Sequence, residues 1–132
     1  MPAAEVSGHI PAGFNAVSPY LLTTETDRLV AFLKAAFGAE EVDEAYSDKD
    51  GIVHAALRIE GCTVEIGRAA GAWKALHAGV HLYVPDVDAS YHRAIAAGGK
   101  SLHEVRVMDY GERAAAVEDP SGNHWYIATY TT

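Results

Sequence analysis

The sequence predicts an α+β fold made of two consecutive βαβββ modules. The first observation is an internal repeat: at a fixed offset of 61 residues, residues 20–27 match residues 81–88, and Gly61 matches Gly122. The second is that each half shows the same order of hydrophobic patterns, which is one strand, one helix and three strands. The third is the length of 132 residues, which suits one domain covering residues 1–132. Two copies of one unit are expected to form a site at their junction, lined by equivalent positions.

The first module covers about residues 12–68 and is predicted to begin with a strand at residues 15–23. The following helix starts near Glu25, because acidic residues stabilise a helix N-terminus, and it ends at Gly38, a residue favoured just after a helix. Its apolar residues recur at helical spacing, at Leu29, Phe32, Leu33, Ala36 and Phe37. Three strands complete the module, at residues 40–46, 53–60 and 62–67, with turns at residues 48–51 and 60–61.

A linker at about residues 69–78, with a helical turn expected near Trp73, leads to the second module at about residues 79–130. This module repeats the order of the first. A strand is predicted at residues 79–84 and a helix at residues 86–97, which two glycines close. The three further strands are predicted at residues 102–107, 113–118 and 123–130, with a tight turn at residues 119–122 whose second position is proline.

Composition narrows the classes of partner and compartment. The net charge is −8 and the Lys and Arg residues are scattered, which argues against nucleic acid and against an anionic membrane surface as partners. No apolar run approaches the ~20 residues of a membrane span, residues 1–11 do not resemble a signal peptide, and no glycine-rich loop indicates a nucleotide cofactor. The single cysteine, Cys62, lies in an apolar run, so we expect a buried structural thiol in a reducing compartment, the cytoplasm.

Strand alternation sorts the side chains of the predicted strands onto two faces. One face is apolar throughout and is expected to pack on the helices. The other carries imidazole, phenol and carboxylate groups, which bind metals, transfer protons near neutral pH and hydrogen-bond small ligands. We interpret this face as the wall of a ligand cavity, and the alternative is a face that is merely solvated or buried in a dimer. Its residues are Tyr20, His54, Glu65, His81, Tyr83, His124 and Tyr126.

Several short segments, in order along the chain, are similar to those of a known family: residues 19–21, 37–39, 54–57, 82–89, 93–94, 110–113 and 117–125. Together they resemble the vicinal oxygen chelate (VOC) superfamily, the glyoxalase/bleomycin resistance/dioxygenase group, and within it the PhnB-like proteins. The resemblance covers about residues 12–130. It implies that the paired modules form a curved, cup-shaped mixed sheet with the helices on its outer face. It also implies a homodimer, whose cup forms within one chain or across the partner. Trp73 and Leu76, apolar residues near the linker that we expect to be exposed, are candidate interface residues.

In glyoxalase-type members of this family, a divalent metal takes one ligand from each of four strands. The resemblance places these ligands at Ser18, Glu65, Gly79 and Tyr126. Only Glu65 is an ordinary metal ligand, so three of the four usual positions are lost and the usual site is not expected. A rebuilt site would use Glu65, His81 and His124, which supply two imidazoles and one carboxylate. Alternatively, Glu65 and one histidine form a hydrogen-bonded pair that orients an organic ligand.

The resemblance leaves two main functions open. One is an enzyme of the lyase, isomerase or dioxygenase type that acts on a small oxygenated molecule, with Glu65 as general base or metal ligand. The other is a non-catalytic protein that binds and sequesters a small molecule, as the bleomycin-resistance relatives do; an accessory dimerisation module with a vestigial cup is a third reading. The predicted substrate-binding residues are Tyr20, His54, Tyr83, Tyr126 and Arg113. For Arg113 the alternative is a structural ion pair with a nearby acid such as Asp109.

Overall fold

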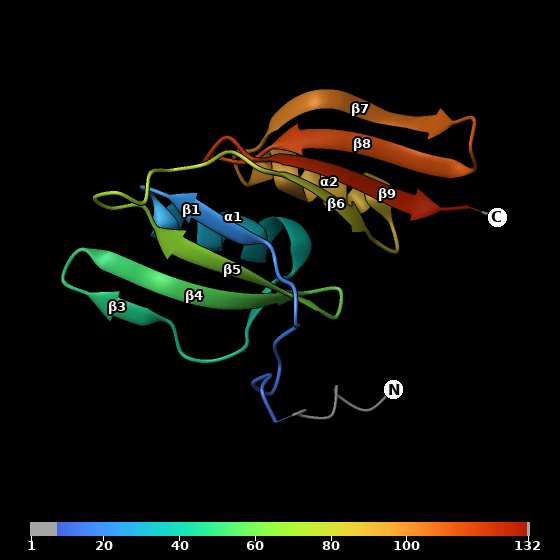
Figure 1. Cartoon of the computed structure of the whole chain (residues 1–132). Coiled ribbons are helices and arrows are strands. Elements are labelled where there is room, and N and C mark those ends of the chain that lie inside the picture. The colour runs from blue at the N-terminus through green and yellow to red at the C-terminus, as the bar shows by residue number, and fades with distance from the viewer. Residues whose placement is uncertain (1–7, 132) are drawn as a thin grey trace.

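Residues 8–131 are described by the computed structural model, and they fold into two mixed sheets and two helices (Figure 1). The elements are, in chain order, β1 (Tyr20–Thr23), α1 (Thr26–Phe37), β2 (Glu40–Glu41), β3 (Tyr46–Asp48), β4 (Gly51–Ile59), β5 (Cys62–Arg68), β6 (Gly79–Tyr83), α2 (Val87–Ala96), β7 (Lys100–Met108), β8 (Glu112–Glu118) and β9 (His124–Tyr130). The first sheet has the strand order β1-β5-β4-β2, with β3 also paired with β4, and the second has the order β6-β9-β8-β7. The predicted α+β fold is confirmed, although its strands form two sheets instead of one.

Equivalent strands of the two modules pair in the same way. β1 runs parallel to β5 and β6 runs parallel to β9, whereas the other neighbouring strands are antiparallel. Tyr20 lies opposite Glu65 in the first sheet, and His81 lies opposite Tyr126 in the second. The 61-residue repeat relates these two pairs to each other. The sequence repeat therefore corresponds to a repeat in how the strands pair.

Both helices begin and end close to where the sequence predicts. Gly38 follows α1 in the left-handed conformation, with φ of 66°, and donates its N–H to the carbonyl of Lys34. Asp86 caps α2, because its carboxylate accepts a hydrogen bond from the N–H of Ala89. α1 packs on the first sheet, α2 packs on the second, and the two helices contact each other. In the part of the chain that the structure describes, the opposite face of each sheet is therefore free of helices.

Three elements differ from the prediction. β1 begins at Tyr20, later than the predicted start of that strand. The strand predicted at residues 40–46 is divided into β2 and β3, because the chain leaves β4 after Val42 donates to the carbonyl of Ala56. In the linker, Ala70 and Trp73 exchange two backbone hydrogen bonds around a tight turn. The expected helical turn near Trp73 is therefore wrong.

The helix-bearing faces of the two sheets share one hydrophobic core, which confirms most of the predicted apolar face. Val17, predicted on the same face, is 88% exposed and lies outside this core. Leu33 of α1 and Ile66 of β5 are fully buried, as are Trp125 and Ile127 of β9. The ring of Phe37, at the end of α1, lies with its centroid 5.0 Å from that of Trp125. The two modules are thus joined through their side chains as well as through the linker. Among residues 8–131, the helices are too short and too polar to cross a lipid bilayer.

The side chain of Cys62 is exposed, so the expectation of a buried thiol is wrong. Cys62 lies on the same face of β5 as Val64 and Ile66, both of which are buried. Cys62 is, however, the first residue of that strand and follows the turn at residues 60–61. At this end of the strand its face borders a cavity instead of the core, which explains the exposure.

Candidate functional site

A cleft separates the neighbouring edges of the two sheets. β1 is an edge strand of the first sheet and β6 is an edge strand of the second, and within residues 8–131 no sheet pairing joins them. Two adjoining cavities, of about 570 and 510 Å³, lie between these edges and share Val17, Pro19, Val80 and His81. We call this pair of cavities the inter-module cleft. Its size is in the range of cavities that bind small organic molecules.

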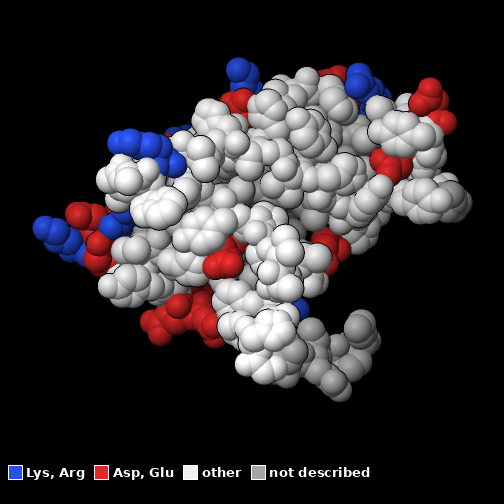
Figure 2. Space-filling model, in the orientation of Figure 1, with Lys and Arg blue, Asp and Glu red and all other residues white. Residues whose placement is uncertain are grey.

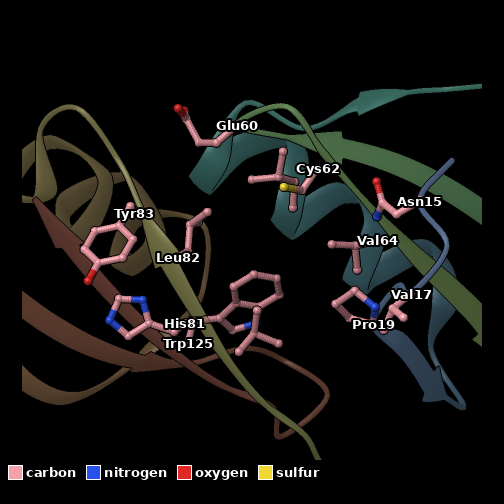
Figure 3. A pocket seen from close by; sticks show the side chains of 12 residues that line it. Asn15, Val17, Pro19, Glu60, Cys62, Val64, His81, Leu82, Tyr83 and Trp125 are labelled. Carbon is pink, nitrogen blue, oxygen red and sulfur yellow. The ribbon is translucent and has the colours of Figure 1, made fainter. Parts of the chain in front are cut away.

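The cleft has an apolar wall and a polar rim. In the larger cavity, Val64 of the first module faces Leu82 and Trp125 of the second (Figure 3). Polar side chains surround this wall, among them Asn15, Glu60, Cys62, His81 and Tyr83. Such a combination of apolar surface and a few polar groups is typical of sites that bind small molecules and fix their orientation.

Equivalent residues of the two modules meet in the smaller cavity. It is lined by Ser18 and Tyr20 from the first module, and by Gly79 and His81 from the second. Ser18 corresponds to Gly79 and Tyr20 corresponds to His81 in the sequence repeat. The junction of the modules is thus a cavity with one phenol and one imidazole at matching positions.

On the first sheet, a histidine and a carboxylate form a pair next to Tyr20. His54 Nε2 and Glu65 Oε1 are 2.9 Å apart, so the ring N–H donates to the carboxylate, and both side chains are partly exposed. The Tyr20 ring lies 5.9 Å from the His54 ring and crosses over Gly67, where a Cβ would lie only 2.6 Å from Tyr20 Oη. A carboxylate that fixes an imidazole in this way prepares it to accept or deliver a proton.

On the second sheet, Tyr83 donates a hydrogen bond to the carboxylate of Glu112, a buried residue at the start of β8. This hydrogen bond favours the protonated phenol and raises the pKa of Tyr83, and the negative charge of Glu112 acts in the same direction. The His81 ring packs on Tyr83 with the centroids 4.6 Å apart. The Tyr126 ring lies beside Gly79, where an added Cβ would lie 3.3 Å from its Cε2 atom.

The three residues of the predicted metal site have separate partners. Glu65 bonds His54, His81 packs on Tyr83, and His124 Nε2 lies 3.2 Å from the carboxylate of Glu118. Within the described part of the chain, no group of three or more His, Cys, Asp or Glu side chains is arranged to hold a metal ion. Because a metal site needs three or four converging donors, the side chains of residues 8–131 do not fit a metal within one chain, and we assign no chemistry to one.

Arg113 lies away from the other predicted substrate-binding residues. Its Nε and Nη2 atoms donate to the two carboxylate oxygens of Asp88, at 2.7 and 2.9 Å, in the first turn of α2. This pairing lowers the pKa of Asp88. Arg113 therefore lies on the helix side of β8. It forms a structural ion pair, which was the alternative to substrate binding, and its partner is Asp88 instead of Asp109.

Sequence reasoning missed Glu112, which contacts the predicted residue Tyr83. Glu112 alternates with Arg113 along β8 and is opposite Tyr130 in β9, so it belongs to the polar face. Sorting the residues of this strand by alternation would have placed it there. Its contact with Tyr83 depends on the relative placement of β6 and β8, which are not neighbours in the sheet.

Comparison with known proteins gives consistent results. Residues 13–127 match the family model described as "Glyoxalase/Bleomycin resistance protein/Dioxygenase superfamily". An uncharacterized protein of Mycobacterium tuberculosis, Rv0887c, is 31% identical over 123 residues, which cover 85% of this chain and 72% of that protein. The crystal structure of TioX from Micromonospora sp. ML1 is 25% identical, with a TM-score of 0.76 over 88% of this chain and 98% of that one. A glyoxalase-related enzyme from Fulvimarina pelagi, 18% identical over 87% of each chain, shares the fold with a TM-score of 0.70.

Proposed function

Because the chain belongs to the glyoxalase/bleomycin resistance protein/dioxygenase superfamily, we propose that it binds a small oxygenated organic molecule in the inter-module cleft. The observation that supports this most is the convergence of Tyr20 and His81, at equivalent positions of the two modules, on one cavity of ligand size. Their hydroxyl and imidazole groups are suited to hydrogen bonds with ligand oxygens. The apolar wall at Val64, Leu82 and Trp125 would bury the carbon skeleton of the ligand.

A second candidate function is metal-independent proton transfer, of the lyase or isomerase type, to or from the bound molecule. The His54–Glu65 pair favours it, because a paired imidazole and carboxylate form a general base near neutral pH. Tyr20 lines the cleft and its ring also packs on the His54 ring. The Tyr20 ring therefore lies between the cleft and the His54–Glu65 pair. Binding with turnover that Glu65→Gln abolishes supports the enzyme, whereas binding without turnover supports sequestration.

We expect the His81→Ala variant to bind ligand about tenfold more weakly than the original protein, because His81 lines both cavities of the cleft. A library of small carboxylic acids, phenols and hydroxyketones is screened by thermal shift, and each hit is confirmed by calorimetric titration. A ligand of the native state raises the melting temperature in proportion to its occupancy. His92→Ala, on the exposed side of α2, is the matched control and is expected to bind normally.

Two results would contradict the proposed site. One is that no compound of the library stabilises the protein saturably, and the other is that His81→Ala retains full affinity for the hits. Nickel, zinc, iron and manganese are tested alone in the same assay. Stabilisation by one of these metals that is lost in Glu65→Gln would favour a metal site instead.

We further propose that the protein is a homodimer that buries the linker. Trp73 is 74% exposed and Leu76 is 63% exposed, and two exposed large apolar side chains in one short segment favour burial against a second copy. Figure 2 shows that most Lys and Arg side chains of this view lie at its margins, and that acidic side chains also lie nearer its middle. Replacing both residues with aspartate is expected to give a monomer in size-exclusion chromatography with light scattering. Val107→Asp, at an equally exposed apolar residue of β7, is the control, and a dimer that survives the double substitution would disprove this interface.

A further inference from the structure

Glu112 is a buried acid without a cationic partner in residues 8–131. Its residue is only 6% exposed, and its side chain takes part in none of the ion pairs of this part of the chain. The one side-chain hydrogen bond that it receives comes from Tyr83. A carboxylate withdrawn from water is unfavourable unless a cation or several donors compensate its charge. A single phenol supplies one donor and no positive charge, so this carboxylate is suited to pair with a cation.

The space in front of Glu112 is surrounded by aromatic rings. A cavity of about 270 Å³ is lined by Glu112 together with Tyr110, Tyr126, His81 and Met108. Alanine residues of β8 form its floor, which keeps it open. The rings of Tyr110, Tyr126 and His81 are exposed, so a ligand can reach their faces. His103 also lines the cavity and is half-buried. The faces of such rings carry partial negative charge and attract organic cations.

The surroundings discriminate against other ligand classes. An anionic group would meet the Glu112 carboxylate and would be repelled by it. The whole chain has 18 acidic and 10 basic residues, so its field attracts cations and repels anions. Tyr83 keeps its proton at neutral pH, because the neighbouring carboxylate raises its pKa, and it remains a donor to Glu112. The second oxygen of that carboxylate has no hydrogen-bond partner among residues 8–131, so it can face a ligand.

We propose that this cavity, next to the inter-module cleft, binds the ammonium or similar organic cation of the ligand, with the charge against Glu112 and the alkyl groups against the tyrosine rings. The inference rests on the proposed function and deepens it, because His81 lines both this cavity and the cleft. A ligand that fills both would carry its oxygenated part at Tyr20 and His81 and its cation at Glu112. The class of ligand is therefore a small cationic molecule.

The experiment compares two probes of the same shape by NMR or calorimetric titration. Choline carries a quaternary ammonium group, and dimethylbutanol is its neutral isostere, in which carbon replaces the nitrogen. Choline is expected to bind saturably and at least about tenfold more tightly than the isostere. Glu112→Gln keeps the shape of the side chain and an acceptor for Tyr83, and it is expected to abolish this preference. Glu118→Gln removes a carboxylate from the same face of β8 and is expected to retain it.

Three results would overturn the inference. The first is equal binding of the two probes, and the second is no binding of choline. The third is that the Glu112→Gln variant, folded with a normal melting temperature, still prefers choline. The library screen distinguishes this failure from failure of the proposed function. If neutral compounds bind and their binding depends on His81, but choline shows no preference, the cleft is upheld and the cation site is rejected. If choline is preferred and this preference depends on Glu112, but no compound of the library depends on His81, the cation site is upheld and the cleft is rejected.

Discussion

The Asp119→Ala variant is expected to lose about 3 kcal/mol or more of its free energy of unfolding, because buried donors left without an acceptor cost about 1–3 kcal/mol each. Asp119 is 3% exposed. Its carboxylate accepts hydrogen bonds from the backbone N–H groups of Ser121 and Asn123, from the side-chain amide of Asn123, and from the indole N–H of Trp125. The expected loss is measured by urea denaturation followed by circular dichroism.

Two controls separate this network from ordinary loss of a surface acid. Asp119→Asn keeps one acceptor oxygen and the shape of the side chain, so its loss is expected to be smaller. Asp86→Ala removes the cap of α2, which typically costs about 1 kcal/mol. A loss for Asp119→Ala no greater than that for Asp86→Ala would contradict the prediction.

The same network fixes one edge of the inter-module cleft. Asn123, held by Asp119, accepts a hydrogen bond from the N–H of Ala78 through its side-chain oxygen, and the carbonyl of Ala78 accepts one from His124. Ala78 directly precedes β6, the strand that carries His81. The turn at residues 119–122 therefore positions the entry to β6, and its stability matters for the site as well as for the fold.

The fold could be predicted because it depends on patterns that are local or repeated. Helical spacing, strand alternation, the glycine after α1 and the acidic cap of α2 are each visible over a few residues. The repeat then relates the two modules and predicts that Tyr20 and His81 occupy equivalent places. Both residues line the smaller cavity of the cleft, at the junction where the repeat predicts a site.

The partners of individual side chains were harder to predict, for different reasons. The contact of His54 with Glu65 follows from the two-residue turn of the β4–β5 hairpin, which fixes the register, so a sequence signal for it exists. The exposure of Cys62 depends on how far the core extends along β5, which alternation alone does not determine. The contact of Tyr83 with Glu112 spans strands that are not neighbours, and it depends on the length and direction of both side chains.

The Trp125→Ala variant is expected to lose about 3–5 kcal/mol, the range typical of removing a large aromatic side chain from a core. Trp125 is fully buried, and its ring contacts Phe37 of the first module while its indole N–H bonds Asp119 of the second. Because this ring joins the cores of both modules, the whole transition is expected to shift to lower urea as one cooperative step. Separate transitions of the two modules, or a loss below about 1 kcal/mol, would contradict this role of Trp125.

The Trp125→Phe variant divides the effect of Trp125 into its two components. Phenylalanine keeps an aromatic ring against Phe37 but removes the donor to Asp119, so combining it with Asp119→Asn in a double-mutant cycle measures the coupling through that hydrogen bond. Trp125 also lines the inter-module cleft, and the smaller ring enlarges the cleft without removing its apolar wall. If the cleft is the ligand site, Trp125→Phe is therefore expected to change which ligands bind while the protein remains folded. An unchanged order of affinities among the hits would place the ligand away from this wall.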